Sequence, residues 1–251
     1  MPRAASGSEA RAHLLATFAV PEAGSRGVGV VAAKHGDRRE GSLEVRWATL
    51  AESTVVFGYA GPVRAIDASM LGDSLYVALR TSDLGFAGPV REREGLGPAG
   101  LRFLARPWDL SAAWVKDAIE HAAVEARDKG WRLRGTFASG GSAHPFTLDL
   151  DRRGDPARLA VARPGGRGER IVVRYGPTKS FRGGTMPRWI EWTQGSAVIR
   201  LSIDEYARGE PARFRHAPAA DPEWTLMTLD DPRSRDLLRR YLGIGERGED
   251  P

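Results

Sequence analysis

The sequence contains no cysteine among its 251 residues. This absence excludes disulfide bonds, thiolate metal sites and a cysteine nucleophile. Lysine is also rare, so arginine supplies nearly all of the positive charge, and the formal net charge is +5. Such a mild excess permits contact with anionic lipid or nucleic acid without requiring either one. The basic residues are spread along the chain and form no block, so charge alone identifies no partner.

Catalytic and metal-binding patterns are also scarce. None of the five histidines stands three to five positions from another, which is the spacing of paired zinc ligands. The segment 140–144 resembles a hydrolase nucleophile elbow, but it lacks the final glycine and lies between two expected strands. The segment 165–168 could cradle a phosphate, yet no Lys-Ser/Thr follows it. Asp149, Asp151 and Asp155 could bind a cation, but a solvated strand edge is the favoured interpretation. The sequence therefore predicts no catalytic residue, no metal and no cofactor.

Long apolar runs are missing as well. No stretch reaches about 18 consecutive apolar residues, the length that a membrane-spanning helix needs. The first seven residues, MPRAASG, do not form the apolar core of a signal peptide. Two alternatives remain at this point: a cytosolic protein, or the mature form of an exported one with a start methionine added.

The clearest helical pattern covers residues 108–127. Its apolar residues recur every three or four positions and form one arc, which includes Trp114 and Ile119. Asp109 is a plausible N-cap and Gly130 a plausible stop. Shorter helices are expected at residues 9–20 and 232–242.

Most of the remaining chain alternates between apolar and polar residues, as half-buried strands do. About eleven such segments are expected: residues 27–34, 42–48, 54–60, 63–70, 75–79, 131–137, 146–150, 159–161, 171–175, 186–193 and 199–203. Short turns separate most of them, and short turns join antiparallel neighbours.

These patterns predict a mainly β (α+β) fold with a single antiparallel sheet. A sheet of about eleven strands is too wide to stay flat, so it curls, closes or splits. The alternation indicates that one face is solvated and the other covered. The central helix and the irregular connection at residues 81–107 are the available covers. The expected architecture is a half-barrel capped by a central helix and loops.

Seven tryptophans are many for this length. They could fill an ordinary core or line an apolar cavity, because a wide curled sheet is hard to fill with side chains alone. Strand phase places the following residues on the inward side, with two from the helix: Val45, Trp47, Phe57, Tyr59, Val77, Leu79, Phe137, Phe146, Leu148, Ile190, Trp192, Ile199 and Leu201, with Trp114 and Ile119.

Several segments, taken in this order, resemble a known family. They are GVG at 27–29, GSLEVRW at 41–47, FGYAGPV at 57–63 and, near the end, MPRWIEW at 186–192. Together with the order of strands and helices, they resemble the LolA/LolB-type lipoprotein carriers of the Gram-negative envelope, over about residues 9–205. The resemblance implies an eleven-stranded half-barrel closed by helices, which binds acyl chains of lipoproteins or lipids and is not an enzyme. Residues 206–251 would then be a C-terminal extension with one helix, packed on the same domain.

The resemblance also implies a place in the cell. In the receptor branch of the family, a hydrophobic residue after a proline, between the third and fourth strands, touches the outer membrane. Pro62 and Val63 occupy that place here. The expected location is the periplasm or the periplasmic face of the outer membrane. A native lipoprotein is implied, whose signal peptide and acylated cysteine are absent from this sequence.

Three functions remain open after this reasoning. The first is transport of lipidated protein or lipid, with acyl chains and a membrane surface as the expected partners. The second is a structural or interaction module of the envelope, which has the same fold but a filled interior and an envelope protein as partner. The third, a cytosolic binder of anionic polymers, rests on charge alone, and no nucleic-acid partner is expected.

Overall fold

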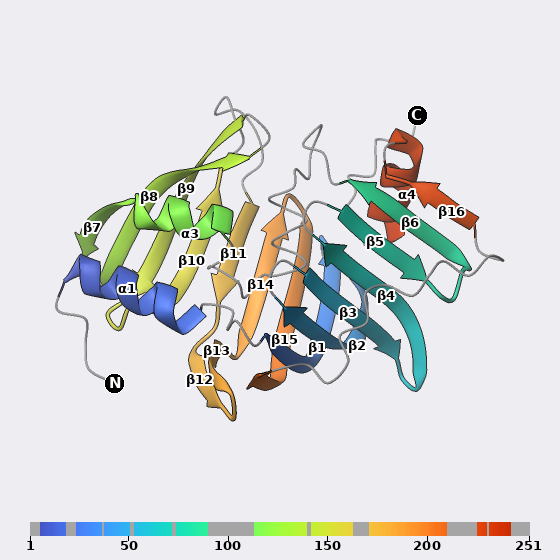
Figure 1. The fold of residues 1–251 in the computed structure, drawn as a ribbon, viewed down its shortest axis with the longest axis horizontal. Coiled ribbons are helices and arrows are strands. Elements are labelled where there is room, and N and C mark those ends of the chain that lie inside the picture. Colours follow the sequence, from blue (N-terminus) through green and yellow to red (C-terminus); the bar gives the residue numbers. More distant parts are fainter. Residues whose placement is uncertain are drawn as a thin grey trace.

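The structure of the chain is a computed structural model that describes residues 6–18, 24–36, 38–50, 53–71, 74–89, 113–139, 142–162, 171–209, 225–229 and 231–241. The largest sheet of the described residues has fourteen strands. Figure 1 shows how it extends across the molecule. Within the described ranges, the hairpin of β12 (Thr178–Phe181) and β13 (Gly184–Pro187) forms a second, two-stranded sheet. The fold is therefore mainly β, as the alternation predicted.

The bounds of the elements are as follows. The helices are α1 (Gly7–Phe18), α3 (Ala113–Glu120) and α4 (Pro232–Tyr241). The strands of the first half of the chain are β1 (Ser25–His35), β2 (Arg38–Leu50), β3 (Ser53–Ala60), β4 (Val63–Leu71), β5 (Ser74–Leu79) and β6 (Leu84–Pro89). Those of the second half are β7 (Ala123–Arg127), β8 (Gly130–Ser139), β9 (Ser142–Asp151), β10 (Pro156–Val161), β11 (Ile171–Tyr175), β12 (Thr178–Phe181), β13 (Gly184–Pro187), β14 (Trp189–Gln194), β15 (Ala197–Arg208) and β16 (Thr225–Thr228).

The large sheet joins the two halves of the chain where β1 pairs with β15. We call this pairing the seam. The strand order of the sheet is β16-β6-β5-β4-β3-β2-β1-β15-β14-β11-β10-β9-β8-β7, and β1 pairs with β15 along its whole length. All pairs are antiparallel except β16 with β6. The end strands β7 and β16 do not pair with each other, so the sheet curls without closing into a barrel. This confirms that strands from both halves share one bent surface.

The strand count of about eleven was too low. The three additional strands of the large sheet are β6, β7 and β16. Strand β6 lies inside the segment 81–107 that was expected to be irregular, and β16 lies in the expected C-terminal loop. Both are short, with six and four residues, and neither shows a clear alternation of apolar and polar residues.

The predicted central helix is the largest error in secondary structure. Helix α3 ends at Glu120, and residues 123–127 form β7, an edge strand paired with β8. Val124 lies opposite Leu133, so its side chain covers the buried face of β8. Tertiary pairing thus overrides the helical propensity of this alanine-rich segment. Gly130, expected to stop a helix, begins β8 with a φ of 152°, in a place where a Cβ would meet Leu150 O at 2.1 Å.

The helices cover one face of the sheet at its two ends. In Figure 1, α1 and α3 lie in front of β7 to β10, while α4 lies beside β6 and β16 at the opposite end. Leu14 and Phe18 of α1 and Ile119 of α3 are buried in the core on that face. The expected half-barrel with helical caps is therefore present, although two of its caps come from the termini.

Candidate functional site

We call the inner face the side of the large sheet on which Trp47, Val77 and Leu148 lie. Residues directly opposite each other in neighbouring strands point to the same face, so the pairing register traces this face from one edge to the other. At the seam, Gly27 lies between Trp47 and Tyr206. A Cβ on Gly27 would lie 2.1 Å from the Trp47 ring, so the indole lies directly over this glycine. The inner face is therefore continuous across the seam.

The first part of the inner face forms a large apolar core under α1 and α3. We call it the first core. Phe137 and Phe146 stack there with ring centroids 4.2 Å apart and an angle of 16° between the ring planes. Most residues that strand phase placed inward belong to it: Val45, Trp47, Ile119, Phe137, Phe146, Leu148, Ile190, Trp192 and Leu201 are buried members, and Ile199 packs against them.

The remaining part of the inner face forms a smaller core near β16 and α4. We call it the second core. Val77 and Leu79 belong to it, so the structure separates them from the other predicted inward residues. Leu229 after β16 is buried there, and Leu237 of α4 packs against it. The C-terminal segment thus contributes side chains to the covering of the same sheet.

Phe57 and Tyr59 do not lie on the inner face, which corrects the strand-phase prediction. Trp47 lies opposite Val56, and Val45 lies opposite Gly58. Phe57 and Tyr59 therefore share the outer face with Arg46 and Glu44, their direct partners. The Arg46 guanidinium lies 5.1 Å from the centroid of the Tyr59 ring. Both faces of β3 carry apolar residues, so alternation alone could not decide which face is covered.

The other predicted residues have different outcomes. Trp114 is the second residue of α3, but its side chain lies outside the part of the chain that the structure describes. Pro62 and Val63 stand at the tip of the β3–β4 hairpin, where Gly61 has a φ of 60°. Val63 is 54% exposed, so an apolar side chain is presented to the surroundings.

Two polar atoms on the inner face were not anticipated. Tyr175 of β11 and Trp192 of β14 are only 6% and 2% exposed. Within the described residues, neither the Tyr175 hydroxyl nor the Trp192 Nε1–H has a hydrogen-bond partner. Burial raises the pKa of Tyr175 far above its ordinary value, so the phenol stays protonated at neutral pH. Sequence patterns give no signal for an unsatisfied polar atom, because its partners are set by tertiary structure.

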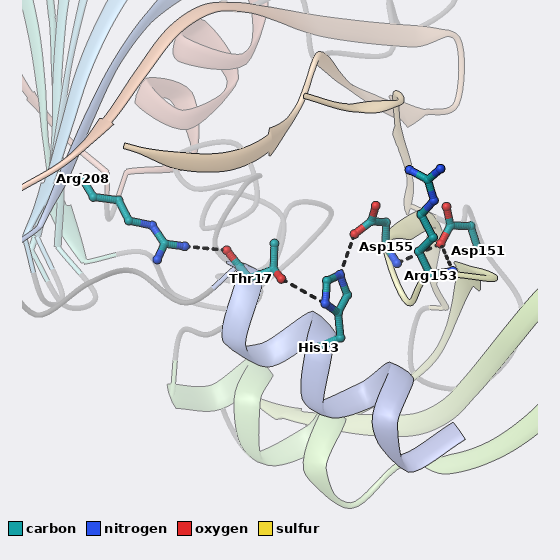
Figure 2. A network of polar contacts seen from close by, with 6 residues as sticks. All are labelled: His13, Thr17, Asp151, Arg153, Asp155 and Arg208. Carbon is teal, nitrogen blue, oxygen red and sulfur yellow. Dashed lines mark hydrogen bonds and ion pairs between the residues drawn. The ribbon is translucent and has the colours of Figure 1, made fainter. Parts of the chain in front are cut away.

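A polar network fastens α1 to the turn after β9, as Figure 2 shows. His13 Nε2 lies 2.9 Å from Asp155 Oδ1, and its Nδ1 lies 3.5 Å from Thr17 Oγ1. The Asp151 carboxylate accepts from the backbone N–H of Arg153 and of Asp155 and shapes the turn. Asp155 is only 8% exposed, so the prediction that it belongs to a solvated edge is wrong. Its role is to anchor a helix.

Two arginines attach the same helix to other elements. Arg11 Nη1 donates to the backbone oxygens of Glu120 and Ala122, at 2.7 and 3.2 Å. Arg208 Nη2 of β15 donates to Thr17 O at 2.8 Å. Helix α1 therefore covers the first core with few buried side chains, namely Ala10, Leu14 and Phe18, and several polar attachments.

The outer face is strongly charged over the second half of the chain. One cross-strand row runs through Glu125, Arg132, Asp149, Arg158, Arg174, Glu191 and Arg200. Arg132 binds Asp149 with two hydrogen bonds, of 2.5 and 3.0 Å. In the first half, Asp67 is buried and accepts from both Arg64 and Arg80. Because these charged side chains cover the outer face, this face does not form a second apolar surface.

The part of the chain that the structure describes contains no cluster of three metal-ligating side chains. None of its helices is both long enough and apolar enough to cross a bilayer.

Comparison with known proteins places the fold. No protein-family model matches the sequence, and the search of curated proteins found no match. Among solved structures, a LolA superfamily protein from Nitrosomonas europaea matches with 16% identity and a TM-score of 0.54, over 87% of this chain and 96% of its own.

Two further structures match with lower scores. One is a DUF1329 family protein from Desulfovibrio piger, with 8% identity and a TM-score of 0.49, over 82% of this chain and 93% of its own. The other is the lipoprotein LppX of Mycobacterium tuberculosis, with 13% identity and a TM-score of 0.29, over 83% and 94%. Only the first score is high enough to support an assignment, and its low identity restricts that assignment to the fold. The chain has a LolA-like fold, as the resemblance of its sequence predicted.

Proposed function

We propose that this protein binds and transports acyl chains of lipidated protein or lipid without catalysis. One observation carries the proposal: the inner face of a single open sheet carries two apolar cores, which are covered by side chains from α1, α3, α4 and the small β12–β13 hairpin. Helices can separate from a sheet without breaking strand pairs. The LolA-like fold supports the same function.

The energetic basis is burial of hydrocarbon. Each CH₂ group that leaves water contributes about 0.8 kcal/mol, so a long chain can displace the side chains of a cover. The residues proposed to contact the ligand are Val45, Trp47, Val77, Leu79, Ile119, Phe137, Phe146, Leu148, Ile190, Trp192, Ile199 and Leu201, and Trp114 remains a prediction.

The hairpin tip provides the proposed contact with a membrane. Val63 is exposed and follows Pro62 between β3 and β4. An apolar residue on a narrow tip can enter the interfacial region of a bilayer while the sheet stays outside. A periplasmic location, or one at the periplasmic face of the outer membrane, is part of this proposal.

Native mass spectrometry of the purified protein tests the proposal. Co-purified lipid, or binding of an added long-chain acyl probe that dodecane competes away, is the expected result. The matched variants are Leu148→Glu on the inner face and Val30→Glu on the outer face, where Val30 is 38% exposed. Binding lost only in the first supports the site. A protein that carries no lipid and binds no probe contradicts the function.

The second candidate is an envelope module with the same fold and a filled interior. The observation that favours it is complete burial: Leu133, Phe137, Leu148 and Val173 are inaccessible to solvent. Such a module would bind an envelope protein and not a lipid. The same probe experiment separates the two candidates.

A further inference from the structure

On the neighbouring strands β11 and β14, the inner face holds two buried hydrogen-bond donors that have no partner among the described residues. They are the Tyr175 hydroxyl and the Trp192 Nε1–H, and both atoms are inaccessible to solvent. Both residues belong to the first core. Such groups are rare in folded proteins, because each lost hydrogen bond destabilises the fold. An unsatisfied pair at one place therefore needs an explanation.

The two residues that carry these donors are neighbours on the sheet. In the pairing of β11 with β14, Val173 lies opposite Trp192 and Tyr175 lies opposite Ile190. Tyr175 and Trp192 are thus diagonal neighbours on one face, with Cα atoms typically ~7–8 Å apart, a distance that two large aromatic side chains readily bridge. Both can serve one polar group between them.

The chemistry of the pair restricts its partner. An indole N–H can only donate, and the phenol stays protonated, so both present a hydrogen. Their cross-strand neighbours Val173, Ile190 and Ile199 have no polar side-chain atom. The matching group is a neutral acceptor with two lone pairs, and a carbonyl oxygen fits this description.

We propose that Tyr175 and Trp192 bind the carbonyl oxygen of an acyl group, and so select esters or amides over plain hydrocarbon and ether lipids. This inference rests on the proposed function and specifies its ligand. The hydrocarbon lies along the apolar inner face, while the carbonyl accepts from the Tyr175 hydroxyl and from Trp192 Nε1–H. The acyl carbonyl has two possible sources: an ester of glycerol, or the amide at the N-terminus of a lipidated protein.

Affinity measurements with three matched probes test the selection. The probes are a diacylglycerol, the dialkyl ether of the same chain length, and an N-acyl peptide with that chain. In the unchanged protein we expect the ester, the amide or both to bind about three- to tenfold more tightly than the ether, the effect of one ordinary hydrogen bond. The tighter of the two identifies the source of the carbonyl.

The variants Tyr175→Phe and Trp192→Phe should lose this preference and keep the affinity for the ether. Tyr59→Phe and Trp189→Phe are the controls, because these residues lie on the outer face: Tyr59 opposite Glu44, and Trp189 opposite Ser202. The infrared carbonyl frequency of a ¹³C-labelled bound ester provides a readout that needs no variant. It should be lower than in hydrocarbon solvent, as hydrogen bonding requires.

Three outcomes are possible. Preference for a carbonyl that disappears in both variants supports the inference. Equal binding of ester, amide and ether, or a preference that survives in Tyr175→Phe and Trp192→Phe, overturns it and leaves lipid binding intact. Failure of all three probes to bind overturns the proposed function, and the inference with it.

Discussion

Buried polar groups of two kinds occur on this sheet, one on each face. Asp67 on the outer face is paired with two guanidinium groups, those of Arg64 and Arg80. Tyr175 and Trp192 on the inner face have no partner among the described residues. A paired buried carboxylate stabilises the folded state only while its partners remain, whereas an unsatisfied donor destabilises the folded state from the start. The two kinds therefore respond to substitution in opposite directions.

Tyr175→Phe should show how the buried hydroxyl changes the stability of the protein at alkaline pH. Burial raises the pKa of Tyr175 above its ordinary value of 10.0, so the unfolded chain releases this proton at a lower pH than the folded protein. Below pH ~10 this proton has no effect on the free energy of unfolding. As the pH rises above ~10, the free energy of unfolding falls, because the unfolded chain releases the proton and the folded protein does not. Urea unfolding at about pH 7, 9 and 11 should show a steeper loss for the unchanged protein than for Tyr175→Phe.

At pH 7 the same variant should be as stable as the parent or up to about 1 kcal/mol more stable, because it removes an unsatisfied hydroxyl. Tyr76, whose pKa is raised mainly by burial and next by Asp67, leaves part of the alkaline effect in place. Parallel pH curves for parent and variant would contradict the assignment of the effect to Tyr175.

Residue by residue, the sequence was a good guide wherever one face of a strand was clearly polar. In β9, Leu148 alternates with Asp149, and the structure buries the first and pairs the second with Arg132. In β3, Phe57 was assigned to the wrong face, because Val55, Val56 and Phe57 are all apolar. The charges that decide the register stand on the neighbouring strand β2, and a single-strand pattern does not include them.

At the scale of elements, long alternating strands and the terminal helix α1 were predictable, and short edge strands were not. Strands β7 and β16 have five and four residues and lie at the two ends of the sheet. An edge strand has one neighbour and a weak periodicity, so its own sequence carries little signal. Strand β7 even shows a helical pattern, which its pairing with β8 overrides.

The C-terminal cover offers a test of how strongly it belongs to the sheet. Leu229 is buried in the second core beside Gly88, where a Cβ would lie 3.2 Å from that of Leu229. Leu229→Ala should lower the free energy of unfolding by about 2–4 kcal/mol, through lost burial and the cavity left behind. Leu226→Ala in the same segment is the control, because Leu226 is 51% exposed and should change stability by less than about 0.5 kcal/mol.

Urea unfolding followed by circular dichroism measures both leucine variants. Equal effects would show that residues 225–229 are not part of the cooperative core.

The attachment of α1 can be weakened by one substitution. His13→Ala removes the contact with Asp155 and should destabilise the helix by about 0.5–1.5 kcal/mol, the value of one partly buried hydrogen bond. Hydrogen exchange of the amides in residues 7–18 should become faster, because local opening of α1 becomes easier. Exchange of a bound acyl probe should also become faster, since α1 covers the first core.

The control for this helix is His121→Ala. His121 follows α3 and is exposed, and its Nδ1 lies 2.9 Å from the backbone oxygen of Asp117 and 3.4 Å from the Asp117 carboxylate. Exposed pairs of this kind contribute little, so neither hydrogen exchange nor probe exchange should change. Unchanged protection of α1 in His13→Ala would show that its apolar residues alone hold it in place.

At the scale of the whole molecule, the seam between β1 and β15 determines whether the chain unfolds as one unit. The sheet carries the first half of the chain on one side of this seam and most of the second half on the other. The sequence predicted the sharing of one surface, because no linker separates the two sets of strands. It could not predict which strands meet, since the pairing depends on two segments about 170 residues apart.

Gly29 is the position where this seam is most sensitive. It follows a register shift between Val28 and Gly29, and a Cβ there would lie 2.2 Å from the backbone oxygen of Ser202. A side chain at residue 29 forces the two backbones apart, because a backbone oxygen cannot rotate away. Gly29→Ala should therefore lower the free energy of unfolding by about 1–3 kcal/mol, the range for overpacking.

Gly58→Ala is the matched control on β3. A Cβ on Gly58 would lie 3.4 Å from its nearest neighbour, in Ile66, and should be accommodated with little loss. Hydrogen exchange in increasing urea, read separately for β3 and for β9, measures both variants. Because β3 and β9 lie on opposite sides of the seam, a shared core requires Gly29→Ala to shift their protection to lower urea by the same amount. A shift confined to one side would mean that the two halves unfold independently, and a ligand on the inner face would then have to span two separately folding units.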